Sequence, residues 1–231
     1  MKIAILSDIH GNDLALRSVL KEIDNVDKIL FLGDYVGYYY NTDLIMDLIE
    51  DYDKEMIKGN HEVLLEESLK NSEKSSEIKN KYGSGIELSK KKLTEKQINY
   101  LTILPDKKQI ELDGLKIFIS HGSPWDLSEY IYPDSPEKTK KKCLEIDSDF
   151  VFIGHSHYPF VYKHDKKTLI NVGSVGQNRK TGGVANWCLL DTKKKTFDIK
   201  ETYYDTKALI DQIKKIDPEQ KYLIEVLERK K

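Results

Sequence analysis

Five short apolar runs in this chain each end abruptly at an aspartate, asparagine or histidine. The runs are almost wholly apolar rather than alternating, a pattern typical of strands that are buried on both faces. Ligands of open α/β sheets bind beyond the carboxyl ends of the strands, so we expect the polar residues after these runs to gather at one edge. The five junctions are Asp8-Ile9-His10, Gly33-Asp34, Gly59-Asn60-His61, His121-Gly122 and Gly154-His155-Ser156-His157.

The spacing and chemistry of these residues indicate metal binding. Asp8 and His10 lie two positions apart, as do His155 and His157. In an extended segment, side chains two positions apart point to the same face, so each pair is expected to reach one ion. Only His164, of the six histidines, lies outside the junctions, and we interpret it as structural. Oxygen and nitrogen donors suit manganese, iron, zinc, cobalt or nickel and disfavour iron–sulfur sites.

The remaining sequence predicts an α/β fold. The apolar runs at 2–7 and 28–32 alternate with helical patterns, which is the βαβ rhythm of a mostly parallel sheet. Residues 62–105 are polar and helical, and we expect them to form a helical layer over that sheet. Asp113-Gly114 lies between two strand-like runs and predicts a hairpin. From residue 150 onward strands dominate, so we expect a second sheet.

We predict one domain over residues 1–231. Its motif-bearing core spans residues 1–190, and a helical extension spans about 206–231. Asp217-Pro218 is expected to open the last helix. The apolar face of that helix could pack on the same domain or on a second subunit of a homo-oligomer.

Composition argues against several other classes of protein. A formal net charge of −2 and a pI near 6.3 do not indicate the basic charge balance that is typical of nucleic-acid-binding proteins. No run approaches the roughly 20 apolar residues needed to cross a bilayer, so we expect no membrane partner. Cys143 and Cys188 match neither zinc nor redox spacing. We interpret them as reduced, and we expect a cytoplasmic protein.

In this order, the five junctions resemble the signature of the calcineurin-like metallophosphoesterases. That signature reads D-x-H, G-D, G-N-H followed by E or D, then H, then G-H-x-H, and all five blocks are present. The flanking residues resemble the small prokaryotic phosphodiesterase and phosphatase branch, over residues 1 to about 190. The resemblance implies a four-layer α-β-β-α sandwich of two mixed sheets, with the metal site at the C-terminal ends of the strands.

The resemblance also implies two divalent metal ions, manganese first, with iron, zinc, nickel or cobalt as alternatives. Asp34 would bridge the two ions. The first ion would be bound by Asp8, His10, Asp34 and His157, and the second by Asp34, Asn60, His121 and His155. A hydroxide held between the ions would attack phosphorus in line. His61 is not a ligand in this pattern and would stabilise transition-state charge or protonate the leaving oxygen.

One departure from the pattern bears on the substrate. Protein serine/threonine phosphatases of the eukaryotic type continue the second block with Asp-Arg-Gly, where this chain has Gly37-Tyr38-Tyr39. The absence of that Asp and Arg favours phosphodiesters or small phosphomonoesters over phosphoproteins. We therefore predict a dinuclear metal-dependent phosphoesterase. A protein or dinucleoside-polyphosphate phosphatase is the alternative, and a non-catalytic metal- or nucleotide-binding scaffold is the third hypothesis.

Further residues are candidates for substrate contact. Tyr38 and Tyr39 belong to a tyrosine-rich loop that could stack on a nucleobase or pack beneath the loop itself. Tyr130 could line the same mouth. Arg179, one of three arginines, could bind phosphate or form a surface salt bridge. Asn12 could contact the substrate or cap the following helix.

Overall fold

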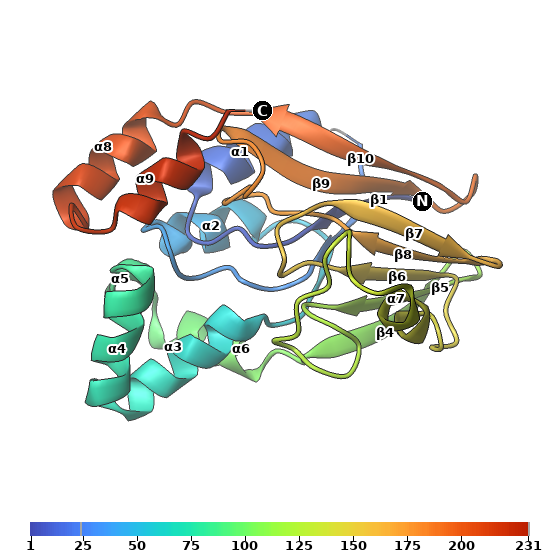
Figure 1. The fold of residues 1–231 in the computed structure, drawn as a ribbon, viewed down its shortest axis with the longest axis horizontal. Helices are drawn as coiled ribbons and strands as arrows, with labels where there is room; N and C mark the ends of the chain where they lie inside the picture. The colour runs from blue at the N-terminus through green and yellow to red at the C-terminus, as the bar shows by residue number, and fades with distance from the viewer. Residues whose placement is uncertain (24, 231) are drawn as a thin grey trace.

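A computed structural model describes residues 1–23 and 25–230 of the chain. Asp24 and Lys231, which the predicted domain includes, lie outside the described residues. Within them the chain forms two five-stranded mixed sheets, with strand orders β10-β9-β1-β2-β3 and β4-β5-β6-β8-β7 (Figure 1). The strands of the first sheet are β1 (Lys2–Leu6), β2 (Lys28–Phe31), β3 (Lys54–Met56), β9 (Val184–Asp191) and β10 (Thr196–Tyr203). Those of the second are β4 (Lys107–Leu112), β5 (Leu115–Ser120), β6 (Phe150–Ile153), β7 (Phe160–His164) and β8 (Lys167–Asn171).

The strands that lead into the five junctions run parallel within each sheet. In the first sheet β1 pairs with β2 and β2 with β3, both in parallel. In the second sheet β5 pairs in parallel with β6, and β6 with β8. Antiparallel strands flank these parallel cores, so both sheets are mixed. The carboxyl ends of β1, β2 and β3 therefore share one edge, as do those of β5 and β6.

The two sheets pack face to face, and this packing explains the continuous apolar runs. Alternate residues of β1 enter different layers. Ile3 and Ile5 join a cluster between the sheets that includes Ile117 and Phe152 of the second sheet. Ala4 and Leu6 point the other way, into the cluster beneath the helices. A strand with both faces covered by apolar layers needs apolar residues at every position.

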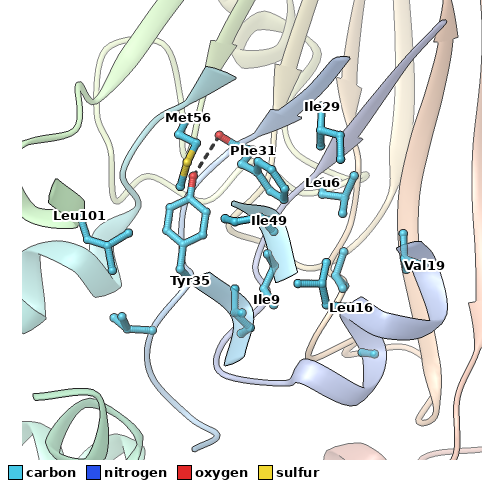
Figure 2. Packing of buried hydrophobic residues seen from close by; sticks show 14 of the residues in the cluster. Leu6, Ile9, Leu16, Val19, Ile29, Phe31, Tyr35, Ile49, Met56 and Leu101 are labelled. Carbon is cyan, nitrogen blue, oxygen red and sulfur yellow. Dashed lines mark hydrogen bonds between the residues drawn. The ribbon is translucent and has the colours of Figure 1, made fainter. Parts of the chain in front are cut away.

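Helices cover the outer faces. Leu16 and Val19 of one helix and Ile49 of another pack against Leu6, Ile29 and Phe31 of the first sheet, as Figure 2 shows. Cys143 and Leu144 lie against Phe118 and Val151 on the outer face of the second sheet. The helices over the first sheet are α1 (Asp13–Glu22), α2 (Thr42–Ile49), α3 (Asn60–Lys70) and α6 (Glu95–Ile103), while α4 (Ser72–Tyr82) and α5 (Gly85–Lys92) pack against these helices, and α7 (Glu137–Cys143) covers the second. The predicted four-layer sandwich is confirmed.

The predicted hairpin at Asp113-Gly114 and the predicted helical region 62–105 are also confirmed. Asp113 and Gly114 form the turn between β4 and β5 with φ of +51° and +75°, the left-handed pair that a tight hairpin requires. Residues 62–105 form α3 to α6 and contribute Leu65 and Leu101 to the core under the helices. In the described part of the chain, no helix has the length and apolarity needed to cross a membrane.

The C-terminal extension folds as α8 (Lys207–Ile216) and α9 (Lys221–Leu227). The last helix begins at Lys221 rather than at Asp217-Pro218, so the predicted start was wrong. Asp217 instead ends α8, because its backbone N–H donates to Ile213 O at 2.8 Å and its carbonyl accepts from Gln220 N–H in the turn that follows. The apolar face of α9 packs on the tyrosine-rich loop of this same chain.

Candidate metal centre

The chain turns sharply as it leaves the strands that carry the predicted ligands. Asp8, His10, Asp34, His155 and His157 have φ between +52° and +63°, in the left-handed region. For residues other than glycine that conformation costs on the order of 1 to 3 kcal/mol and is concentrated at functional sites. The expectation that each pair shares one face of an extended segment was therefore wrong. Left-handed turns bring Asp8 and His10 to one group of donor atoms, whereas His155 and His157 belong to different groups, so the expectation that the second pair reaches one ion was wrong.

The first cluster joins ligands from both sheets. Asp8 and His10 follow β1 of the first sheet, and His157 follows β6 of the second. The Nε2 atoms of His10 and His157 are 3.2 Å apart, and Asp8 Oδ1 lies 3.1 Å from His157 Nε2 and 3.7 Å from His10 Nε2. All three side chains are fully buried. These donor atoms are close enough together to bind one metal ion.

The second cluster is also drawn from both sheets. Asp34 and Asn60 follow β2 and β3, while His121 and His155 follow β5 and β6. His121 Nε2 lies 3.2 Å from Asp34 Oδ2, 3.1 Å from Asn60 Oδ1 and 3.1 Å from His155 Nδ1. Asp34 Oδ2 is also 3.6 Å from His10 Nε2 of the first cluster. The structure thus brings together all seven predicted ligands, with Asp34 between the two clusters.

Backbone carbonyls orient the four imidazoles. Each ring uses one nitrogen for a carbonyl, which leaves the other nitrogen free to face the cluster, as metal-binding histidines do. The pairs are His10 Nδ1 with Val36 O at 3.2 Å, His121 Nδ1 with Leu32 O at 2.7 Å, His157 Nδ1 with Gln177 O at 2.6 Å, and His155 Nε2 with Ser128 O at 3.0 Å.

The charges of the site fit divalent cations. Burial lowers the pKa of His155 to about 3 and of His157 to about 4, so both rings are neutral donors. Burial opposes a charge on His121, but Asp34 and Asp8 raise its pKa to about 9. Asp8 Oδ1 is buried without a hydrogen-bond donor among the described residues. A cation would satisfy that oxygen and displace the proton of His121.

Glu62 holds the bridging loop in place, a role that the sequence analysis missed. Its buried carboxylate accepts hydrogen bonds from the backbone N–H groups of Asp34, Tyr35 and Gly59 at 2.8 Å and of Val36 at 3.2 Å. Glu62 is the third residue of α3, and its bond from the N–H of Gly59, the residue before the helix, is the glutamate half of a capping box. A glutamate at the third residue of the predicted helix was therefore the sequence feature that could have indicated this role.

His61 lies beside the clusters, and its ring is also close enough to His10 and Asp34 for the three side chains to hold an ion. Its backbone N–H donates to Asp34 Oδ1 at 2.8 Å, and its ring centroid is 4.6 Å from that of His10 and 4.9 Å from that of Tyr38. Burial lowers its pKa to about 3 although Asp34 raises it. Its Nδ1 is buried and has no hydrogen-bond partner among the described residues, in keeping with the missing Asp of the second block. Tyr82, the last residue of α4, also contacts this ring at 5.1 Å, and no sequence signal indicated it.

The structure separates the candidates for substrate contact. Tyr38 lies at the centre, with its ring 4.6 Å from that of His10. Tyr39 does not, because it is fully buried against the C-terminal helices and its hydroxyl donates to Leu223 O at 3.5 Å. Asn12 is also fully buried. Its side chain accepts from the N–H of Ala15 to cap α1 and donates to Gly176 O, so the capping alternative is correct.

The remaining two candidates lie at the mouth of the centre. The ring of Tyr130 stacks on that of His155 with centroids 3.8 Å apart. Arg179 lies beside this tyrosine, with Cζ 5.9 Å from the ring centroid. Within the described residues Arg179 forms no salt bridge with a carboxylate, so the surface salt bridge considered above is not formed.

Two stacked mixed sheets with converging histidines and aspartates at their strand ends define a metal-binding α/β sandwich. The chain belongs to the calcineurin-like phosphoesterase superfamily, whose domain model matches residues 1–195. It is 35% identical to an uncharacterized protein, MJ0912, of Methanocaldococcus jannaschii, over 92% of each chain. It is 26% identical to the phosphodiesterase MJ0936 of the same organism, over 85% of this chain and 96% of that one. A solved metallophosphoesterase from Sphaerobacter thermophilus shares the fold, with a TM-score of 0.79, 23% identity and 98% of each chain covered.

Proposed function

We propose that this protein is a dinuclear metal-dependent phosphoesterase that hydrolyses phosphodiesters or small phosphomonoesters. The position of Asp34 carries the proposal. Its Oδ2 lies 3.2 Å from an imidazole nitrogen of one cluster and 3.6 Å from one of the other, where a carboxylate can bridge two ions. Membership of the phosphoesterase superfamily and the phosphodiesterase among the relatives support the same reaction class.

The ligand residues and their neighbours would have different roles in the reaction, metal binding for the former and contact with the leaving group for the latter. The seven ligand residues would hold two divalent cations, manganese first, which would supply charge neutralisation at phosphoryl oxygens and an activated water at neutral pH. The imidazoles and carboxylates fix where those ions lie, since each ring is oriented by a carbonyl. His61 and Tyr38 form the adjoining wall, where a leaving oxygen or its developing charge would be met by hydrogen bonds.

The test compares bis-p-nitrophenyl phosphate and p-nitrophenyl phosphate with manganese, then with a chelator. We expect hydrolysis that the chelator removes and manganese restores. Asp34→Asn should lower kcat/KM by more than ~10- to 100-fold, which is the loss typical when a residue hydrogen-bonded to a metal ligand is replaced. Asp147→Asn, at an aspartate 83% exposed, is the matched control and should leave turnover unchanged. Unchanged turnover in Asp34→Asn would refute the proposal.

Two other functions give different results. A protein or dinucleoside-polyphosphate phosphatase would prefer phosphopeptides or dinucleotides in a substrate panel. A non-catalytic scaffold would bind two metal ions per chain and hydrolyse none of these esters.

A further inference from the structure

Arg179 is a cation beside the metal centre that pairs with no carboxylate in the described part of the chain. Its guanidinium is half-buried, and its Nε is buried with no hydrogen-bond partner among the described residues. Within the same residues no carboxylate lies within salt-bridge distance of it. The other two arginines differ, since Arg17 pairs with Asp13 at 3.1 Å and Arg229 donates to a carbonyl. A buried charge that is left unpaired is costly, which points to a partner that arrives from outside the chain.

The surroundings of Arg179 place that partner at the metal centre. Its Cζ lies 5.9 Å from the ring centroid of Tyr130, and Tyr130 stacks on the ligand His155. Arg179 is also two residues from Gln177, whose carbonyl accepts from Nδ1 of the first-cluster ligand His157 at 2.6 Å. The guanidinium therefore lies one aromatic ring away from a ligand of the second cluster. An anion held by the metals would lie within its reach.

The C-terminal extension holds Arg179 in this place. Arg229 Nη1 donates to the backbone carbonyl of Arg179 at 2.6 Å, and Gly182 N–H donates back to the carbonyl of Arg229 at 2.8 Å. A side chain at Gly182 would overlap the carbonyl of Leu227 at the end of α9, so the two segments touch directly. These contacts come from residues beyond 195, where the superfamily model ends.

We infer that Arg179 binds the phosphoryl group of the substrate and gives this site a preference for phosphomonoesters over diesters. The inference rests on the proposed function and chooses between its two substrate classes. A guanidinium matches phosphate in a bidentate manner. A monoester carries about −1.5 to −2 charges and three terminal oxygens, whereas a diester carries one charge and two such oxygens. Arg179, in the loop after β8, would then serve in place of the arginine of the Asp-Arg-Gly sequence that this chain lacks after Gly33-Asp34.

The test uses the manganese-loaded full chain as wild type, Arg179→Ala, Arg179→Lys and Arg17→Ala. For Arg179→Ala we expect kcat/KM on p-nitrophenyl phosphate to fall about 10- to 100-fold, as for a lost charge-assisted hydrogen bond. On bis-p-nitrophenyl phosphate it should fall much less. Arg179→Lys should lie between wild type and Arg179→Ala, and Arg17→Ala should match wild type. An equal fall on both esters, or no fall, would overturn the inference.

Inorganic phosphate gives a second measurement that does not depend on turnover. It should raise the melting temperature of the manganese-loaded wild type and of Arg17→Ala, but much less that of Arg179→Ala. If wild type hydrolyses neither ester while phosphate binding depends on Arg179, the proposed function fails and the phosphoryl-binding role stands. If wild type is active and Arg179→Ala binds phosphate equally well, the role of Arg179 is refuted and the function stands.

Discussion

Replacing Glu62 with glutamine should destabilise the protein by about 2 to 6 kcal/mol. One carboxylate oxygen accepts from the N–H groups of Tyr35 and Val36, and the other from those of Asp34 and Gly59. An amide has only one accepting oxygen, so in either orientation two of these buried donors would face an NH₂ group. Each buried donor that loses its acceptor costs about 1 to 3 kcal/mol, and the two together give the stated range.

Urea unfolding of the chelated protein measures this effect without a contribution from bound metal. Burial and the charge of Asp34 raise the pKa of Glu62 to about 7, so the comparison is made at pH 8, where the wild-type carboxylate is ionised. Glu66→Gln is the matched control. It lies one turn along α3, pairs with Lys70 at the surface, and should cost less than about 1 kcal/mol. Equal midpoints for the two variants would refute the reasoning.

Two further predictions concern His61. His61→Ala should retain two metal ions per chain by elemental analysis while kcat/KM falls about 10²- to 10⁴-fold, and loss of metal would mean that His61 is a ligand. Gly37→Ala should disturb the same ring, because Gly37 has φ +89° and its Cβ would overlap His61 Nδ1. Gly114→Ala is the control, because Gly114 also has a left-handed φ of +75° but no atom lies within 4 Å of an added Cβ. This variant therefore introduces backbone strain without steric overlap. We therefore expect Gly37→Ala to lower both stability and turnover more than Gly114→Ala, and equal effects would contradict the predicted overlap.

The sequence predicted the strands and the convergence of ligands for a physical reason. A strand buried on both faces must be apolar throughout, so the boundaries of β6 at Phe150 and Ile153 could be read directly. Polar residues that directly follow such strands lie at the edge that the carboxyl ends of the strands share. The turns themselves could not be predicted. Left-handed φ values such as those at Asp8 and Asp34 are uncommon for residues other than glycine, and here they follow from tertiary contacts.

The errors and omissions share a cause, which is dependence on distant parts of the chain. Tyr38 and Tyr39 are neighbours in a tyrosine-rich loop, yet one contacts His61 and the other is covered by α8 and α9, about 170 residues away. The pattern around Tyr39 carries no information about that cover. For Arg179 the sequence left phosphate binding and a surface salt bridge open, because its position at the mouth depends on the distant residues Tyr130 and Arg229.

The origin of the ligands in both sheets has a mechanical consequence. Asp8 and His10 come from one sheet and His157 from the other, and Asp34 and His121 are divided in the same way. Each cluster can assemble only when the two halves of the sandwich are docked. Metal affinity and the closure of the sandwich are then one linked equilibrium. An ion bound in either cluster would hold the two sheets together, so any force or mutation that separates the sheets would weaken metal binding at both clusters.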